Sequence, residues 1–194
     1  MTTPDPTTPV SLGTGPADTS GPGPVGLAGP GRAFPGPAGP GSRWWPDRSR
    51  SADAPGCLAC DVNNLRVAPP GGLIIATDTW VADHCIPPMA RGYVILKPRR
   101  HVTAVADLSP AEAGDFGVVA QRLMAAMRTV LAPARIYRFD FGESLDHLHF
   151  HLMPRHPGMP PTGAALIERV FAHEWLVTES EAADAARRIR EALG

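Results

Sequence analysis

Residues 147–155 read His147-Leu148-His149-Phe150-His151-Leu152-Met153-Pro154-Arg155, in which histidine first alternates with apolar side chains. Three of the seven histidines of the chain lie within the five consecutive residues 147–151. Alternation is the period of a half-buried β-strand, on which residues two apart share one face. We therefore expect Leu148, Phe150 and Leu152 to face a core, with three imidazoles about 6.6 Å apart on the other face.

A row of imidazoles has several chemical uses. Imidazole acts as nucleophile, general acid, phosphate ligand or metal ligand, and it titrates near neutral pH. The row therefore indicates an active site, and the alternative is a set of surface histidines on an amphipathic strand. A catalytic zinc held by three histidines is a further hypothesis. Because the row spans about 13 Å, one ion would need a ligand from another strand.

Composition excludes several classes of protein. The 194 residues carry a net charge of -1, which gives no electrostatic footprint for nucleic-acid polymers or anionic membranes. No apolar run reaches the roughly 18 residues that span a bilayer, and the N-terminus lacks the pattern of a secretory signal. Three cysteines are too few for a disulfide scaffold. We expect a cytoplasmic protein that binds neither membranes nor nucleic acid.

The first 55 residues differ in composition from the rest. They contain 12 of the 23 prolines and 10 of the 20 glycines, with few long aliphatic side chains. Such a segment cannot form helices or bury a core. We predict a disordered Pro/Gly-rich tail over residues 1–55, in which Trp44-Trp45 is the one apolar feature. Residues 56–194 suffice for one domain with a single core.

The domain reads as strands interrupted by one long helix. We expect strands over residues 72–76, 80–84, 92–97, 136–141 and 148–154. Ser109, Pro110 and Glu112 form a strong helix start, because serine can cap, proline fits the first turn and glutamate completes a capping box. That helix ends at residue 131, and a last helix covers residues 178–193. The pattern predicts an α+β fold: an antiparallel sheet with one long packed helix and a C-terminal helix.

Residues 147–153 resemble the signature of the histidine triad (HIT) superfamily, in which three histidines alternate with apolar residues. Two further segments are similar to family motifs, namely Leu96-Lys97-Pro98-Arg99-Arg100-His101 and the turn Gly142-Glu143-Ser144. The resemblance extends over residues 57–155. It implies a HIT-like fold for residues 56–194, and a homodimer, because many members pair through the long helix and a sheet edge.

The resemblance implies chemistry at the α-phosphate of a nucleotide conjugate, such as a dinucleoside polyphosphate or a nucleoside phosphoramidate. The chain would be a hydrolase or transferase in which His149 attacks phosphorus and forms a covalent nucleotidyl-histidine. The other nitrogen of that ring must then donate to a fixed acceptor, such as a backbone carbonyl. His151 would donate to a phosphate oxygen, and Ser144 would hold the same phosphate.

Other residues near the triad extend or weaken this hypothesis. Arg155 and His156 could reach a β-phosphate or leaving group, or lie solvated at the rim. Glu143 stands where members carry glutamine, and its carboxylate would repel a polyanion. Cys85 stands where members carry a ribose-binding acid, which puts adenosine specificity in doubt. The alternative is therefore a non-catalytic nucleotide- or partner-binding module of the same fold.

Cys57-Leu58-Ala59-Cys60 adds a second inference. A Cys-x-x-Cys pair needs two further ligands to close a tetrahedral zinc site. The resemblance supplies His101 and the first histidine of the triad, His147, and so implies a structural zinc. A pair of free thiols and a redox pair are the alternatives.

Four more residues are given structural or surface roles. Arg99 and Arg100 are interpreted as surface charges. His84 and His173 have no supporting context and are interpreted as structural.

Overall fold

The computed structural model describes residues 54–142 and 145–194. The predicted disordered tail up to residue 53, including Trp44-Trp45, lies outside these residues, and so do Glu143 and Ser144. Among the described residues, no helix combines the length and apolar character needed to cross a membrane.

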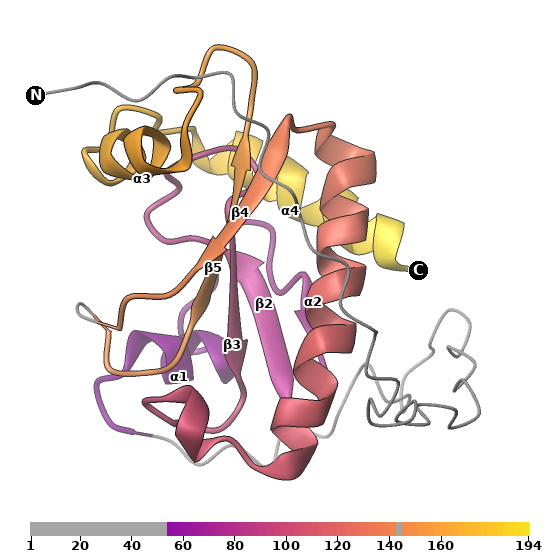
Figure 1. Cartoon of the computed structure of the whole chain (residues 1–194). Helices are drawn as coiled ribbons and strands as arrows, with labels where there is room; N and C mark the ends of the chain where they lie inside the picture. The colour runs from indigo at the N-terminus through magenta and orange to yellow at the C-terminus, as the bar shows by residue number, and fades with distance from the viewer. Residues whose placement is uncertain (1–53, 143–144) are drawn as a thin grey trace, which may run out of the picture. The chain divides into compact units, whose positions relative to one another are not determined.

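The centre of the fold is a five-stranded antiparallel sheet with strand order β1-β2-β3-β5-β4 (Figure 1). The strands are β1 (Ile75–Ala76), β2 (Trp80–His84), β3 (Val94–Pro98), β4 (Arg135–Phe139) and β5 (Phe150–Arg155). The sequence predicts all five, with bounds that differ by a few residues. The predicted α+β class with an antiparallel sheet is confirmed.

Helices occupy both sides of this sheet. They are α1 (Leu58–Asn63), α2 (Pro110–Leu131), α3 (Gly163–Phe171) and α4 (Glu179–Leu193), with a short 3-10 turn η2 (Val105–Asp107) before α2. The sequence pattern predicts α2 and α4 but does not predict α1 and α3. Both missed helices have fewer than ten residues, which is too short for a periodic pattern to stand out.

Local chemistry explains why α2 begins and ends where predicted. The Ser109 hydroxyl accepts from the Glu112 amide at 3.2 Å, and the Glu112 carboxylate accepts from the Ser109 amide at 2.7 Å. This reciprocal pair is the expected capping box. At the other end Ala132 adopts a left-handed conformation with φ 45°, which stops the helix before Pro133.

The main core lies between one face of the sheet and helices α2 and α4. Leu148, Phe150 and Leu152 point into it, as the alternation predicts. Helix α2 contributes Val119, Leu123 and Met127, and α4 contributes Ala185, Ala186 and Ile189. In Figure 1, α2 lies to the right of β3 and β5, whereas α1 and α3 lie to their left.

The opposite face of the sheet packs against α3. Leu166 and Val170 of this helix are fully buried in a second cluster with Tyr93 and Met153. Gly163 begins the helix directly against a strand, since a Cβ there would stand 2.8 Å from the Tyr137 ring. This face carries His151, whose partners across β5 are Ile95 on one side and Phe139 on the other.

The expectation that the three histidines share one strand needs correction. Strand β5 begins at Phe150, so His147 and His149 precede the strand rather than lie on it. The cause is that the Leu148 amide donates to the Val102 carbonyl, in the loop beyond β3, at 2.7 Å.

The surface role predicted for Arg99 is wrong. Its side chain is buried and its Nε donates to the Thr77 carbonyl at 3.1 Å. Arg100 does lie at the surface, where it forms a 2.8 Å ion pair with Glu112. The buried neighbour Lys97 pairs with Asp83 across β2 and β3, and burial raises the pKa of Asp83 against the opposing effect of this lysine.

Candidate active site and metal centre

Four predicted ligands meet at the base of the triad. The ligand atoms of Cys57, Cys60, His101 and His147 all lie within 4.8 Å of one another. Nδ1 of His147 is 3.5 Å from the Cys57 sulfur and 3.6 Å from the Cys60 sulfur, and Nδ1 of His101 is 3.6 Å from the latter. Tetrahedral zinc with ordinary bond lengths sets sulfur and nitrogen ligands about 3.6 Å apart. Donor chemistry and spacing therefore fit a metal of this kind.

The ring of His147 is oriented for ligation by its second nitrogen. Its Nε2–H donates to the Pro98 carbonyl at 3.0 Å, which leaves the Nδ1 lone pair directed at the two thiols. Burial is the main cause that lowers the pKa of His147 to about 4. The ring is neutral at pH 7, which is the form that binds a metal.

The ring of His149 has different partners from that of His147. Its Nδ1 lies 2.7 Å from the backbone carbonyl of His147, and a carbonyl can only accept, so Nδ1 carries the proton. In the neutral form of this ring, Nε2 carries the lone pair, and the ring lines a cavity. The predicted hydrogen bond from this histidine to a backbone carbonyl is thus present.

His151 is held by a residue that sequence reasoning missed. The Tyr93 hydroxyl lies 2.6 Å from Nδ1 of His151. Burial raises the pKa of Tyr93 and lowers that of His151 to about 4, so both groups are neutral at pH 7. When the phenol donates to Nδ1, the ring proton sits on Nε2 and can be donated to a ligand. The only sequence signal for Tyr93 is its place at the start of a predicted strand.

The two outward histidines line a cavity of about 320 Å³. This volume is at the lower end of the roughly 300–1,000 Å³ typical of small-molecule sites. Helix α3 forms one wall and the start of the β4–β5 connection forms another. The lining residues are Phe141, Gly142, His149, His151, Ile167, Glu168 and Phe171.

Other predicted substrate-binding residues lie elsewhere or outside the described residues. Arg155 donates from Nη1 to the Pro161 carbonyl and does not line this cavity. Glu143 and Ser144 are outside the described residues, although Gly142 just before them lines the cavity.

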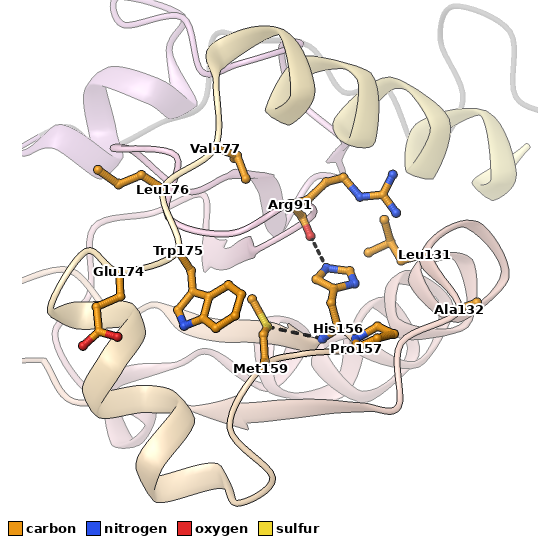
Figure 2. A pocket seen from close by; sticks show the side chains of 10 residues that line it. All are labelled: Arg91, Leu131, Ala132, His156, Pro157, Met159, Glu174, Trp175, Leu176 and Val177. Atoms are coloured by element: carbon orange, nitrogen blue, oxygen red, sulfur yellow. Dashed lines mark hydrogen bonds between the residues drawn. The ribbon is translucent and has the colours of Figure 1, made fainter.

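His156 belongs to a second cavity, of about 570 Å³ (Figure 2). Its Nε2–H donates to the Arg91 carbonyl at 2.8 Å. Figure 2 shows this ring between Arg91 and Met159, with Trp175 on the opposite side of the hollow. His149 and His151 do not line it.

The residues near the predicted ribose position are structural. Cys85 is buried, and this burial raises the pKa of its thiol to about 12. The His84 ring donates from Nδ1 to the Cys85 carbonyl at 3.2 Å and accepts from the Gly92 amide at 3.1 Å. His173 is exposed and adopts a left-handed φ of 61° after α3. The structural interpretation fits His84, whose ring is buried and bonded at both nitrogens, whereas the side chain of His173 is exposed.

Residues 68–158, which contain the five strands and the three clustered histidines, match the family model described as HIT domain, in agreement with the resemblance seen in the sequence. A nitrilase and fragile histidine triad fusion protein (NitFhit) of Caenorhabditis elegans is 28% identical over 112 residues, 49% of this chain and 26% of that protein. The chain thus spans about a quarter of that relative.

A HIT-like protein of Mycobacterium tuberculosis, described as uncharacterized, is 27% identical over 106 residues, 52% of this chain and 69% of that protein. Among solved structures, a Hit-like protein of Bartonella henselae aligns with TM-score 0.57 and 18% identity, covering 73% of this chain and 98% of that one. A Zn-bound histidine triad family protein of Mycobacterium smegmatis aligns with TM-score 0.54 and 21% identity, covering 71% and 93%. These structural likenesses show the fold.

Proposed function

We propose that the protein is a nucleotide hydrolase or nucleotidyltransferase that acts at the α-phosphate of a nucleotide conjugate through a covalent nucleotidyl-His149. The observation that carries the proposal is the 2.7 Å hydrogen bond from His149 Nδ1 to the His147 carbonyl. It fixes one tautomer and leaves Nε2 as a nucleophile in a cavity of suitable size.

The reaction proceeds in two displacements. The Nε2 lone pair of His149 forms a bond to phosphorus as the bond from phosphorus to the leaving group breaks; the leaving group departs with the electron pair and takes a proton from solvent. Water or another acceptor then attacks phosphorus and loses a proton, and the phosphorus–nitrogen bond breaks with the electron pair returning to His149. Together, the two displacements replace one difficult substitution with two easier ones.

His151 serves the same phosphate from the neighbouring position. The phenol of Tyr93, bonded to Nδ1 at 2.6 Å, supports the tautomer with a proton on Nε2. That N–H donates to a non-bridging oxygen and offsets the charge that develops in the transition state. Ser144 is proposed as a second phosphate contact.

Cys57, Cys60, His101 and His147 would hold a structural zinc. When bound, the metal ties α1, the loop after β3 and the start of the triad into one unit. The His147 side chain belongs to this cluster, while its carbonyl accepts the His149 proton at 2.7 Å. One residue therefore links the metal site to the orientation of the nucleophile. Among the described residues, neither His149 nor His151 belongs to this group of potential ligands.

Intact mass spectrometry tests the proposal. The protein is mixed with nucleoside phosphoramidates and dinucleoside polyphosphates and quenched without acid, because a phosphohistidine is acid-labile. We expect a nucleotidyl adduct on the wild type and on His156→Ala, a matched histidine variant outside the cavity, but not on His149→Ala. No adduct and no substrate consumption would instead favour the binding module.

Location and assembly stay predictions. A cytoplasmic protein and a homodimer are expected from the sequence and from the family. Sedimentation of the full chain would test the assembly.

A further inference from the structure

Helix α3 contributes to the cavity from outside the segment that matches the family. The match ends at residue 158, whereas Ile167, Glu168 and Phe171 of α3 line the cavity beside the triad. The helix is anchored by fully buried Leu166 and Val170. Its inner side chains therefore form a fixed wall rather than a loose flap.

Two phenylalanines that line the cavity are exposed, one from the β4–β5 connection and one from α3. Phe141 is 51% exposed and Phe171 is 40% exposed, and their ring centroids lie 6.1 Å apart at an interplanar angle of 67°. Both rings also approach His151, at 6.3 and 5.8 Å between centroids. Water-exposed aromatic rings gathered at one polar site indicate a place where a ligand covers them.

A third phenylalanine, Phe139, contacts His151 from strand β4. It stacks on the imidazole of His151 with centroids 4.8 Å apart and an interplanar angle of 11°. This contact leaves Phe139 fixed in the sheet while Phe141 and Phe171 extend toward solvent. A flat ring entering the cavity would meet those two rings next to the phosphate-binding histidines.

The charge of the wall restricts what can enter. Apart from the two histidines, Glu168 is the one ionisable side chain among the described residues that line the cavity. Its carboxylate lies on α3 one turn before Phe171. An anionic group beside it would be repelled, while an uncharged or cationic group would not.

We propose that Phe141, Ile167 and Phe171 form a subsite for a flat aromatic ring of the substrate, and that Glu168 makes it favour uncharged or cationic ring-bearing groups over further phosphates. This inference rests on the proposed function of His149. The ring is either the nucleobase or an aromatic leaving group, because both offer the same stacking surface.

Steady-state kinetics of the full chain separate these two sources. In one arm, adenosine 5′-phosphorobenzylamidate is compared with the corresponding ethylamidate, so only the leaving group changes. In the other arm, it is compared with ribose 5-phosphorobenzylamidate, so only the base is removed. We expect a preference of about tenfold in kcat/KM for the ring in one arm, the size typical of one stacked base.

Variants test whether the phenylalanines cause this preference. Phe171→Leu, which keeps apolar bulk but removes the ring, and Phe141→Ala are expected to abolish the preference mainly through a higher KM. Phe171→Trp should retain it. Leu176→Ala, an equally exposed apolar residue that lines the other cavity, is the matched control and should change nothing. A preference that survives both ring-removing variants overturns the subsite.

A charge variant tests the second half of the proposal. Glu168→Gln should raise the relative kcat/KM for diadenosine triphosphate over the benzylamidate by about two- to fivefold, as expected for an exposed charge. An unchanged ratio overturns the role of Glu168.

Failure of the chemistry can be told from failure of the subsite. If the wild type turns over none of these compounds, the proposed function is wrong. Calorimetry of AMP, ribose 5-phosphate and benzylamine with wild type and Phe171→Leu then decides the subsite alone. Ring-dependent binding that is lost in the variant supports it, and its absence in the wild type overturns it.

Discussion

His147 and His149 stand two residues apart and have opposite surroundings. The first engages both ring nitrogens within the protein, one with the Pro98 carbonyl and one toward the thiols of Cys57 and Cys60. The second engages only Nδ1, and its ring lines a cavity. The same side chain is thus suited to hold structure in one place and to do chemistry in the other, because hydrogen-bond partners decide which nitrogen is free.

Replacing His149 should have the largest effect. The variant His149→Ala removes the imidazole whose Nδ1 is held by the His147 carbonyl, so we expect kcat/KM to fall by at least about 10⁴-fold. Metal content and thermal stability should stay close to wild type. Turnover rates of His149→Ala and of the control His156→Ala provide the measurement, and equal losses in both would contradict the nucleophile assignment.

Removing the thiols of Cys57 and Cys60 should reduce metal content and stability. The double variant Cys57→Ser/Cys60→Ser is expected to lose about one zinc per chain and about 4–5 kcal/mol of unfolding free energy. Metal analysis and urea unfolding measure the two effects. Cys85→Ala, a buried cysteine outside the cluster, should keep its metal. Loss of zinc in His149→Ala would instead support a catalytic metal on the triad.

Acid should destabilise the fold through His151. Its folded pKa of about 4 lies below the ordinary 6.5, so between these values the unfolded chain binds a proton that the folded chain does not. Above pH 6.5 the titration of His151 therefore costs no stability, and from there toward pH 4 the free energy of unfolding should fall by about 3 kcal/mol. In His151→Gln this part of the slope should vanish, and parallel pH curves for the two proteins would refute the assignment.

The smallest of these effects concerns the tyrosine behind His151. Tyr93→Phe removes the hydroxyl that fixes the ring tautomer and should lower kcat about tenfold, with KM little changed. The variant should also move the acid limb of the pH–rate profile, which a purely structural role would not do. An unaltered pH profile together with a normal kcat would show that His151 orients itself without this phenol.

Much of this architecture was predictable because it depends on local patterns. The capping box at Ser109 and Glu112, the apolar stripe of α2 and the alternation before β5 each involve residues close in sequence. Helix α3 could not be predicted in the same way. Its role depends on Tyr137 and Phe139, which lie on another element and contact it only after the chain has folded.

The residues of the candidate site also fall into a predictable and an unpredictable group. The resemblance to the family identified His149, His151 and the four clustered ligands, since their types and spacing are readable in the chain. It gave no indication of Tyr93, of the buried state of Arg99, or of the Phe141–Phe171 pair.

The sequence by itself determined the α+β class, the capped helix and the histidines that carry the chemistry, because periodicity and residue type are local properties. Only the tertiary structure decided that His147 turns to the cysteines while His149 turns to a cavity. The physical reason is that a ring nitrogen becomes a ligand, a donor or a nucleophile according to partners that are distant in the chain, such as Pro98 and Tyr93.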